Sequence, residues 1–287
     1  MITLTSDFGS PYPAAMKGVV LGRSDARLVD VAHDLPRQDV RAAAFWLCEI
    51  LPYFPPATHL VVIDPGVGTD RNALIVRAAD HILVGPDNGV LCPVARRLAG
   101  DGAIETYAID ERSLDRIDPA TGDTDPPTGT PPPDSDNDSD SQGPASNTFH
   151  GRDVFAPAAA TVHDTPVEEL ADHDFLSAAD PEIDLELPTG VVENGRARGQ
   201  VLVVDEFGNV ITNVPGSYLT DRDTIVANGE PVPVGETFAA VSIGDRLATV
   251  GSHGYVELDV NQGRGDEAFG LTTGDDVVLE PGGDDDA

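Results

Sequence analysis

Four polar side chains in the N-terminal half have the types and spacing that chemistry at a ligand site requires. Asp7 and Asp64 each follow a short apolar segment typical of a strand, and Arg71 comes shortly after Asp64. His150 stands at the start of a segment typical of a helix. A carboxylate at a strand end can accept the hydroxyls of a ribose, an Arg can hold a carboxylate ionised, and a His can position or deprotonate a nucleophile.

Each of these residues also has a simpler structural interpretation, which the spacing alone leaves open. Asp7 could serve a turn or cap a helix, and Asp64 with Arg71 could be an ion pair that ties a loop. A lone His is often only a hydrogen-bonded structural residue. The glycines Gly66 and Gly68 allow a tight turn and a close approach to a ligand. No Walker, HExxH, GxSxG or GxGxxG motif occurs in the chain.

The C-terminal third carries a second group of polar residues between short strand-like segments. Asn209 lies in a Gly-Asn turn that could simply join two strands, or its amide could bind a zwitterion. Ser252, Glu257 and Asn261 form another polar cluster. Glu257 stands in an otherwise apolar strand, where an acid could meet an ammonium group or merely face solvent.

The elements that must position these residues divide the chain into two domains. Short apolar segments alternate with amphipathic ones through the first part, which predicts an α/β N-terminal domain, 1–187, with a largely parallel central sheet. Residues 118–147 are rich in Pro and Asp and predict a disordered acidic insertion. From 188 to 287 the short strands and Gly/Asn/Asp turns, including a strand expected over 239–243, predict an all-β barrel-like C-terminal domain.

The composition restricts the partners. The chain has 287 residues and a formal net charge of −33, and Lys17 is its only lysine among 17 basic residues. Such a negative surface repels nucleic acid and anionic lipid, and a Lys-poor, Asp-rich surface is typical of a halophile's cytoplasm. No segment approaches the run of about 20 apolar residues that spans a bilayer, and no secretory signal is visible. We therefore expect a cytoplasmic protein with a small-molecule substrate, no nucleic acid and no membrane.

Several longer motifs occur in a characteristic order along the chain: Ser6–Gly9, Asp34–Pro36, Gln38–Val40, Val62–Thr69, Gly85–Leu91, Thr148–Pro157 and Asp205–Asn213. That order resembles the S-adenosyl-L-methionine hydroxide adenosyltransferases, the hydrolytic relatives of fluorinase and chlorinase. The resemblance covers nearly the whole chain except 118–147 and the acidic C-terminal tail. It implies hydrolysis of S-adenosyl-L-methionine to adenosine and L-methionine, with no metal and no cofactor.

The resemblance also implies roles for individual residues. The family's water-handling set falls on Asp64, Arg71 and His150, and its ribose-binding acid falls on Asp7. Positions that contact the ligand from the C-terminal domain match Asn209, Ser252 and Glu257, whereas Val260 and Asn261 lie where the backbone meets adenine. The family forms homotrimers, with each active site between the N-terminal domain of one subunit and the C-terminal domain of a neighbour.

Two other functions remain possible on the same pocket. One is transfer of the adenosyl group to a halide such as chloride. In the halogenating relatives a serine helps to hold the halide, whereas this chain has Gly151 there, which favours hydrolysis. The other is a non-catalytic sensor that binds adenosine or S-adenosyl-L-methionine without turnover.

Overall fold

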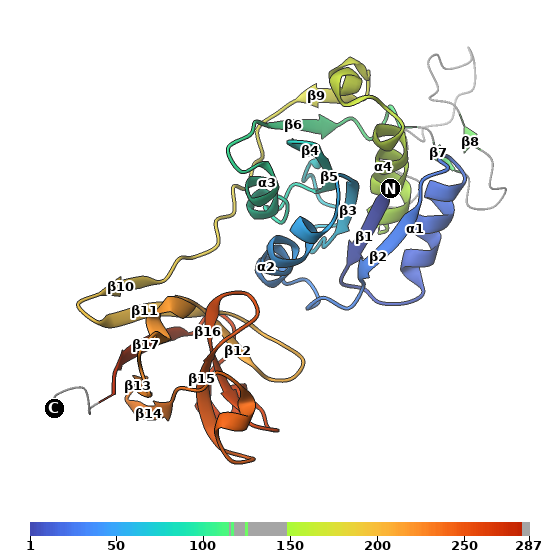
Figure 1. Ribbon diagram of the computed structural model, residues 1–287. Helices are drawn as coiled ribbons and strands as arrows, with labels where there is room; N and C mark the ends of the chain where they lie inside the picture. Colours follow the sequence, from blue (N-terminus) through green and yellow to red (C-terminus); the bar gives the residue numbers. More distant parts are fainter. Residues whose placement is uncertain (115, 118–123, 126–147, 283–287) are drawn as a thin grey trace, which may run out of the picture. The chain divides into compact units, whose positions relative to one another are not determined.

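The computed structural model describes residues 1–114, 116–117, 124–125 and 148–282. The chain divides into two compact units, Met1–Glu186 and Leu187–Ala287 (Figure 1). Apart from 124–125, the predicted disordered insertion 118–147 lies outside the described residues, as does the acidic tail. None of the described helices is long and apolar enough to cross a membrane.

A seven-stranded mixed sheet forms the centre of the N-terminal unit, with strand order β2-β1-β3-β5-β4-β6-β9. Its strands are β1 (Ile2–Ser6), β2 (Leu28–Ala32), β3 (Thr58–Val62), β4 (Ala73–Ala78), β5 (His81–Pro86), β6 (Ile104–Ile109) and β9 (Leu176–Ala178). The pairs β1–β2, β1–β3 and β3–β5 are parallel, whereas β4 pairs antiparallel with β5 and β6, and β6 pairs antiparallel with β9.

The expectation of a largely parallel sheet is therefore wrong, although the α/β class is confirmed. Only two residues, Ala79 and Asp80, join β4 to β5. A connection this short can form only a hairpin, because a parallel pair needs a crossover of a dozen or more residues. Ala79 turns the chain with a φ of 51°. The antiparallel half of the sheet then grows outward from this hairpin.

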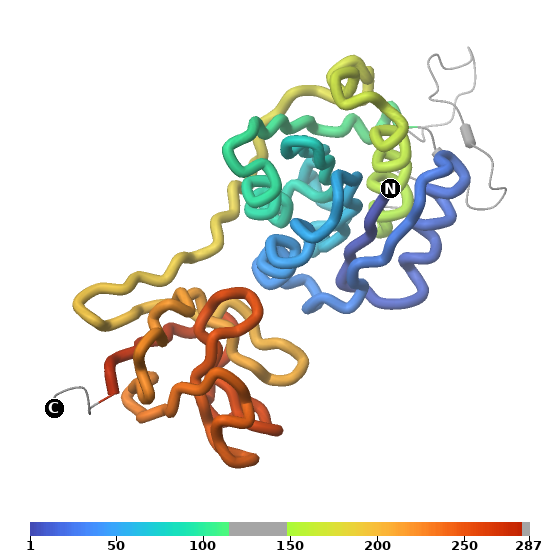
Figure 2. The backbone as a smooth tube through the Cα atoms, viewed as in Figure 1, coloured from blue at the N-terminus to red at the C-terminus, as the bar shows by residue number. Residues whose placement is uncertain are grey.

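Helices cover the sheet on both sides (Figures 1 and 2). They are α1 (Tyr12–Leu21), α2 (Val40–Ile50), α3 (Cys92–Ala99) and α4 (Ala156–His163). Helix α4 packs on α1 and on β1, β3 and β5, while α3 packs on α2 and on β4, β5 and β6. Helix α2 begins where the Asp39 carboxylate accepts the backbone N–H of Ala42 at 2.9 Å, and its apolar side chains recur at helical spacing.

The C-terminal unit is a nearly closed, antiparallel, barrel-like sheet with strand order β14-β13-β17-β11-β12-β16-β15. Its strands are β10 (Val191–Glu193), β11 (Arg196–Val204), β12 (Val210–Pro215), β13 (Thr224–Ala227), β14 (Glu230–Pro233), β15 (Arg246–Val250), β16 (Tyr255–Val260) and β17 (Asp276–Pro281). An isolated bridge between Val234 and Ala248 connects the two ends of the sheet. Strand β10 pairs with β11, and a short helix, α5 (Gly265–Phe269), packs on β16.

The strand expected over 239–243 is wrong. A 3-10 turn, Phe238–Ala240, occupies this segment, and Gly244 follows it with a φ of 88°. The N–H of Asp245 closes a turn onto the carbonyl of Ser242 at 3.0 Å. The apolar residues of this segment are exposed in part, so they do not belong to the barrel core.

A separate two-stranded sheet joins β7 (Arg116–Ile117) to β8 (Thr124–Asp125).

Candidate active site

The carboxylate of Asp64, the guanidinium of Arg71 and the imidazole of His150 are in direct contact. Asp64 lies just after β3, Arg71 just before β4, and His150 before a π-helical turn, Gly151–Phe155, that leads into α4. Arg71 Nε and Nη2 donate to Asp64 Oδ1 and Oδ2 at 2.8 and 2.5 Å. Arg71 Nη2 also lies 2.8 Å from His150 Nδ1. The Arg71 and Asp64 side chains are only 8% and 6% exposed, so solvent screens this bidentate pair weakly.

The loop that carries Asp64 and Arg71 is held in shape by its own hydrogen bonds. Thr69 Oγ1 donates to the carbonyl of Gly66 at 2.7 Å, and Gly68 takes a φ of 79°. The guanidinium carbon of Arg71 lies 5.0 Å from the ring centre of Phe155. Two carboxylate contacts and one aromatic face therefore fix the Arg71 side chain.

Contact with Arg71 determines the tautomer of His150. A guanidinium can only donate hydrogen bonds, so His150 Nδ1 must accept. The pKa of His150 is lowered, chiefly because the ring is buried. Arg71 lowers this pKa further, and Glu111, Asp64 and Asp153 raise it, but burial outweighs them and the ring stays neutral. The ring proton then sits on Nε2. His150 in this state is a hydrogen-bond donor at its outer nitrogen rather than a free base.

A small cavity of about 140 Å³ brings Asp7 to the same place as Asp64 and His150. Asp7 is 8% exposed, and its Oδ2 accepts the backbone N–H of Gln38 at 2.6 Å. Gln38 has a φ of 61°, and that turn aims its N–H at the carboxylate. Three of the predicted N-terminal site residues thus line one cavity, and the fourth, Arg71, supports two of them from behind.

Gly151 is packed too tightly to carry a side chain. A Cβ there would lie 2.8 Å from Met16 Sδ, 3.1 Å from a ring carbon of Phe149 and 3.2 Å from a methyl group of Val62. Met16 is fully buried in the core, so it has little freedom to retreat. A side chain at position 151 would therefore require Met16, Phe149 and Val62 to shift.

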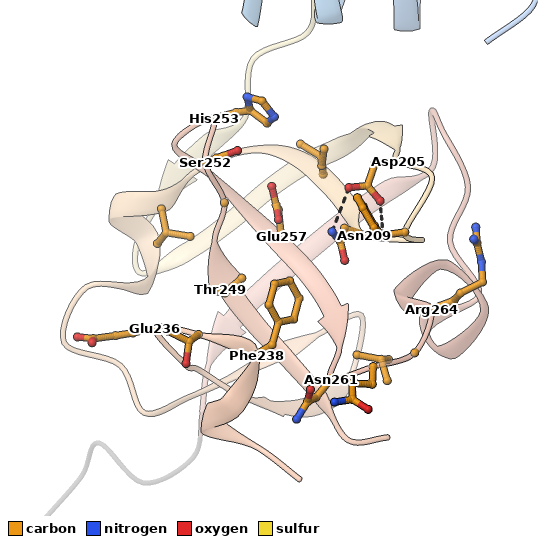
Figure 3. A pocket seen from close by; sticks show the side chains of 18 residues that line it. Asp205, Asn209, Glu236, Phe238, Thr249, Ser252, His253, Glu257, Asn261 and Arg264 are labelled. Atoms are coloured by element: carbon orange, nitrogen blue, oxygen red, sulfur yellow. Dashed lines mark hydrogen bonds between the residues drawn. The ribbon is translucent and has the colours of Figure 1, made fainter. Parts of the chain in front are cut away.

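The five predicted residues of the C-terminal unit line one pocket of about 980 Å³ (Figure 3). They are Asn209, Ser252, Glu257, Val260 and Asn261. Asp205 and Phe238, which the sequence did not single out, also line it. Asp205 accepts both the backbone N–H and the side-chain amide of Asn209, at 2.9 and 3.0 Å. These two contacts fix the direction of the Asn209 amide.

Acidic groups gather at this pocket. Glu257 is 7% exposed, and burial together with the charge of Asp205 raises its pKa to about 7. Behind it, Asp259 is fully buried, and burial, Glu257 and Asp205 raise its pKa to about 8. Neither carboxyl oxygen of Asp259 has a hydrogen-bond partner among the described residues. A single Asp in a strand of alternating apolar residues was the only sequence signal for this group, and it was missed.

No three His, Cys, Asp or Glu side chains come together in a way that could hold a metal ion, within the parts of the chain that the structure describes.

Comparison with known proteins agrees with this arrangement. Residues 2–171 match the SAM hydroxide adenosyltransferase N-terminal domain, and residues 199–278 match the SAM hydroxide adenosyltransferase C-terminal domain. The chain belongs to this family. The match spans both units, so the adenosyltransferase assignment covers the cluster around Arg71 and the C-terminal pocket alike.

Curated relatives match this chain over nearly its full length. An (R)-S-adenosyl-L-methionine hydrolase of Salinispora tropica is 34% identical over 289 residues, which is 98% of each chain. One of Thermus thermophilus is 36% identical over 283 residues, 96% of this chain and 97% of its own. A fluorinase of Actinopolyspora mzabensis is 24% identical over 305 residues, 91% of this chain and 90% of its own.

Solved structures resemble both units together. An uncharacterized conserved protein from Thermotoga maritima superimposes with a TM-score of 0.75 at 28% identity, covering 98% of this chain and all of its own. A conserved hypothetical protein from Thermus thermophilus gives a TM-score of 0.67 at 33% identity, covering 97% of this chain and 98% of its own.

Proposed function

We propose that this protein hydrolyses S-adenosyl-L-methionine to adenosine and L-methionine, by attack of water at C5′ of the ribose. The observation that carries the proposal is the contact set of Asp64, Arg71 and His150 in a chain of this family. Relatives with 34% and 36% identity are named as hydrolases of this substrate.

The chemistry suits a buried, preorganised site. C5′ of the substrate is bonded to a sulfonium, so methionine leaves as a neutral thioether. The new C5′–O bond forms as the C5′–S bond breaks, and the electron pair of the C5′–S bond stays on sulfur. Positive charge at carbon and sulfur is consumed, so exclusion of bulk water favours the transition state over the separated groups.

Asp64 and His150 have complementary roles toward one water molecule. Nε2–H of His150 donates to a lone pair of the water oxygen, and Asp64 accepts one of its protons. An Asp–Arg pair cannot ionise water as a metal does, so the main gain is orientation of the oxygen in line with the C5′–S bond. Such positioning can contribute about 7–11 kcal/mol in favourable cases. Arg71 keeps both partners in place.

Substrate recognition is shared between the two pockets. Asp7 lines the small cavity and would accept the ribose hydroxyls. The C-terminal pocket, with Asn209, Ser252, Glu257, Val260 and Asn261, would take the adenine and methionine portions. A cavity of about 140 Å³ would hold only part of the substrate, since ligand sites are usually roughly 300–1,000 Å³. As the family resemblance implies, we propose a homotrimer in which one subunit's N-terminal unit and a neighbour's C-terminal unit complete each site.

Product analysis in labelled water tests the proposal. Purified protein in molar salt should release adenosine and methionine in equal amounts, and mass spectrometry should find the water-derived oxygen label at the 5′ position of adenosine. Absence of the label from adenosine would refute attack by water. Tight binding of substrate that stays intact would instead identify a sensor.

Variants test the residue roles separately. Asp64→Ala, Arg71→Ala and His150→Ala should each lower kcat far more than they raise KM. Arg77→Ala is the matched control, because Arg77 also pairs with a carboxylate, that of Glu105 at 3.2 Å, but its side chain is one-third exposed on β4, the strand that follows Arg71. Wild-type turnover in all three cluster variants would refute the assignment of these residues.

Halide transfer is the second candidate, favoured only by the similarity to fluorinases. Gly151 offers no hydroxyl to a halide, a side chain there would displace Met16, and the Asp64 carboxylate repels an incoming anion. We expect no 5′-chloroadenosine or 5′-fluoroadenosine among the products, even in molar chloride.

A further inference from the structure

A second cavity lies against Arg71. It has a volume of about 330 Å³ and is lined by two segments, 69–73 and 109–112. Arg71 lines this cavity, whereas Asp64 and His150 line the cavity of about 140 Å³ that also holds Asp7. Arg71 therefore connects the reaction side of the cluster to a second polar space, whose walls include the acids Asp70, Asp110 and Glu111.

The cavity wall brings Glu111 near Arg71. Strands β4 and β6 pair antiparallel as far as Leu74 and Ala108, so the segments 71–73 and 109–111 leave the paired region at the same end of the two strands and line one cavity. Glu111 is half-buried, and it acts on His150 as well as facing the same cavity as Arg71. The charged groups that act on His150 are Glu111, Arg71, Asp64 and Asp153; Glu111 is the strongest of the four and raises the pKa of the ring.

The charge of the cluster explains why an acid is useful there. Asp64 and Arg71 cancel, and His150 is neutral, so these three groups together carry no net charge. The attack moves one positive charge from the sulfonium to these three groups, because the thioether leaves neutral and the proton of the water stays in a site whose side chains are less than a tenth exposed. Positive charge that arrives at a buried group is costly unless an anion lies near it. Glu111 supplies a negative charge that acts on His150, in addition to the Asp7 carboxylate that lines the reaction cavity.

We propose that Glu111 is a positioning residue of the hydrolytic site, which acts through Arg71 and His150 and balances the charge when the cluster takes up the proton of the attacking water. The inference rests on the proposed function. In this step the water oxygen bonds to C5′, the C5′–S electron pair stays on sulfur, and the proton passes to Asp64. No further reactant is required.

The test compares Glu111→Gln with Asp70→Asn in the full-length protein. Both changes remove one negative charge from the wall of the same cavity, but Asp70 is exposed and is not among the charges that act on His150. Glu111→Gln should lower kcat about tenfold with KM changed less than twofold, and Asp70→Asn should match the wild type. Glu111→Asp, which keeps the charge, should retain most of the wild-type kcat.

Two pH measurements separate an electrostatic role from a structural one. With Glu111→Gln, the acid limb of the kcat profile should move to lower pH, because loss of the negative charge lowers the pKa of His150. The ring titration of His150, followed by NMR without substrate, should shift in the same direction. Unchanged kcat and titration in Glu111→Gln, or equal losses in Glu111→Gln and Asp70→Asn, would overturn the inference. Because the titration needs no turnover, it remains decisive even if the wild-type protein releases no adenosine.

Discussion

The buried carboxyl of Asp259 should destabilise the folded protein at neutral pH, and its removal should reveal by how much. Asp259 is fully buried on β16, and both its oxygens are without a hydrogen-bond partner among the described residues. Folding therefore holds the group protonated: its pKa is raised to about 8, whereas an Asp in the unfolded chain ionises near 3.8. Asp259→Asn removes the ionisable proton while it keeps the size of the side chain.

The pH dependence follows from proton linkage. Between pH 3.8 and about 8 the folded state binds more protons at Asp259 than the unfolded state, so the stability that this group contributes falls as the pH rises. At about 1.4 kcal/mol per unit, its ionisation in the unfolded chain favours unfolding by about 4 kcal/mol at pH 7 and about 2 kcal/mol at pH 5. These are upper limits, because Glu257 shares the titration.

The measurement is the free energy of unfolding in urea, at pH 5 and pH 7 in constant molar salt, together with calorimetry to separate the two units. Asp259→Asn should stabilise the C-terminal unit at pH 7, and should do so more at pH 7 than at pH 5. Asp223→Asn, an exposed acid of the same unit, is the control and should change neither value by more than about 0.5 kcal/mol. An equal gain at both pH values, or a loss at pH 7, would refute the reasoning.

Three further predictions concern other buried groups. Because the pKa of Glu257 is about 7, the affinity for the cationic substrate should rise with pH through neutrality as this carboxyl ionises, and calorimetric binding curves for Glu257→Gln should lose that dependence. Gly151→Ser should cost about 1–3 kcal/mol of stability, measured by urea unfolding, since its Cβ meets Met16, and it should yield no halogenated product. Burial lowers the pKa of His59 to about 3, so between pH 6.5 and 3 only the unfolded state binds a proton at this residue. Acidification from pH 6.5 to 4.5 should therefore lower the free energy of unfolding by about 3 kcal/mol. His59→Gln should not show this loss in urea unfolding curves measured over the same pH range.

Local patterns were sufficient to predict most elements near the N-terminal site. The strand Ile2–Ser6 and the helix around Ala43 and Leu47 follow from runs and spacings that depend on neighbouring residues only. Hydrophobic periodicity alone did not give the direction of β4. The two-residue connection between β4 and β5 did, because only a hairpin can be this short, and the expectation of a largely parallel sheet overlooked it.

The site divides in the same manner. Motif order along the chain singled out Asp64, Arg71 and His150, and the structure places them in contact. Spacing could not reveal that Arg71 donates a hydrogen bond to His150 Nδ1, because the two residues are 79 positions apart and their contact depends on the tertiary fold. Asp259 was missed for the opposite reason: an acid in a strand of a strongly acidic protein looks like a solvent-facing residue, and only its zero exposure distinguishes it.

The acids of the C-terminal pocket bear on product release as well as on binding. Burial and the charge of Asp205 raise the pKa of Glu257, and burial, Glu257 and Asp205 raise the pKa of Asp259, so these two carboxyls resist ionisation in the free protein. A ligand with an ammonium and a sulfonium supplies the missing positive charge and favours the ionised acids. Hydrolysis converts the sulfonium to a thioether and removes one of the two cations, so the same carboxylates attract the product less than the substrate. On the proposed function, this acidic pocket should bind the substrate more strongly before the C5′–S bond breaks than it binds methionine afterwards.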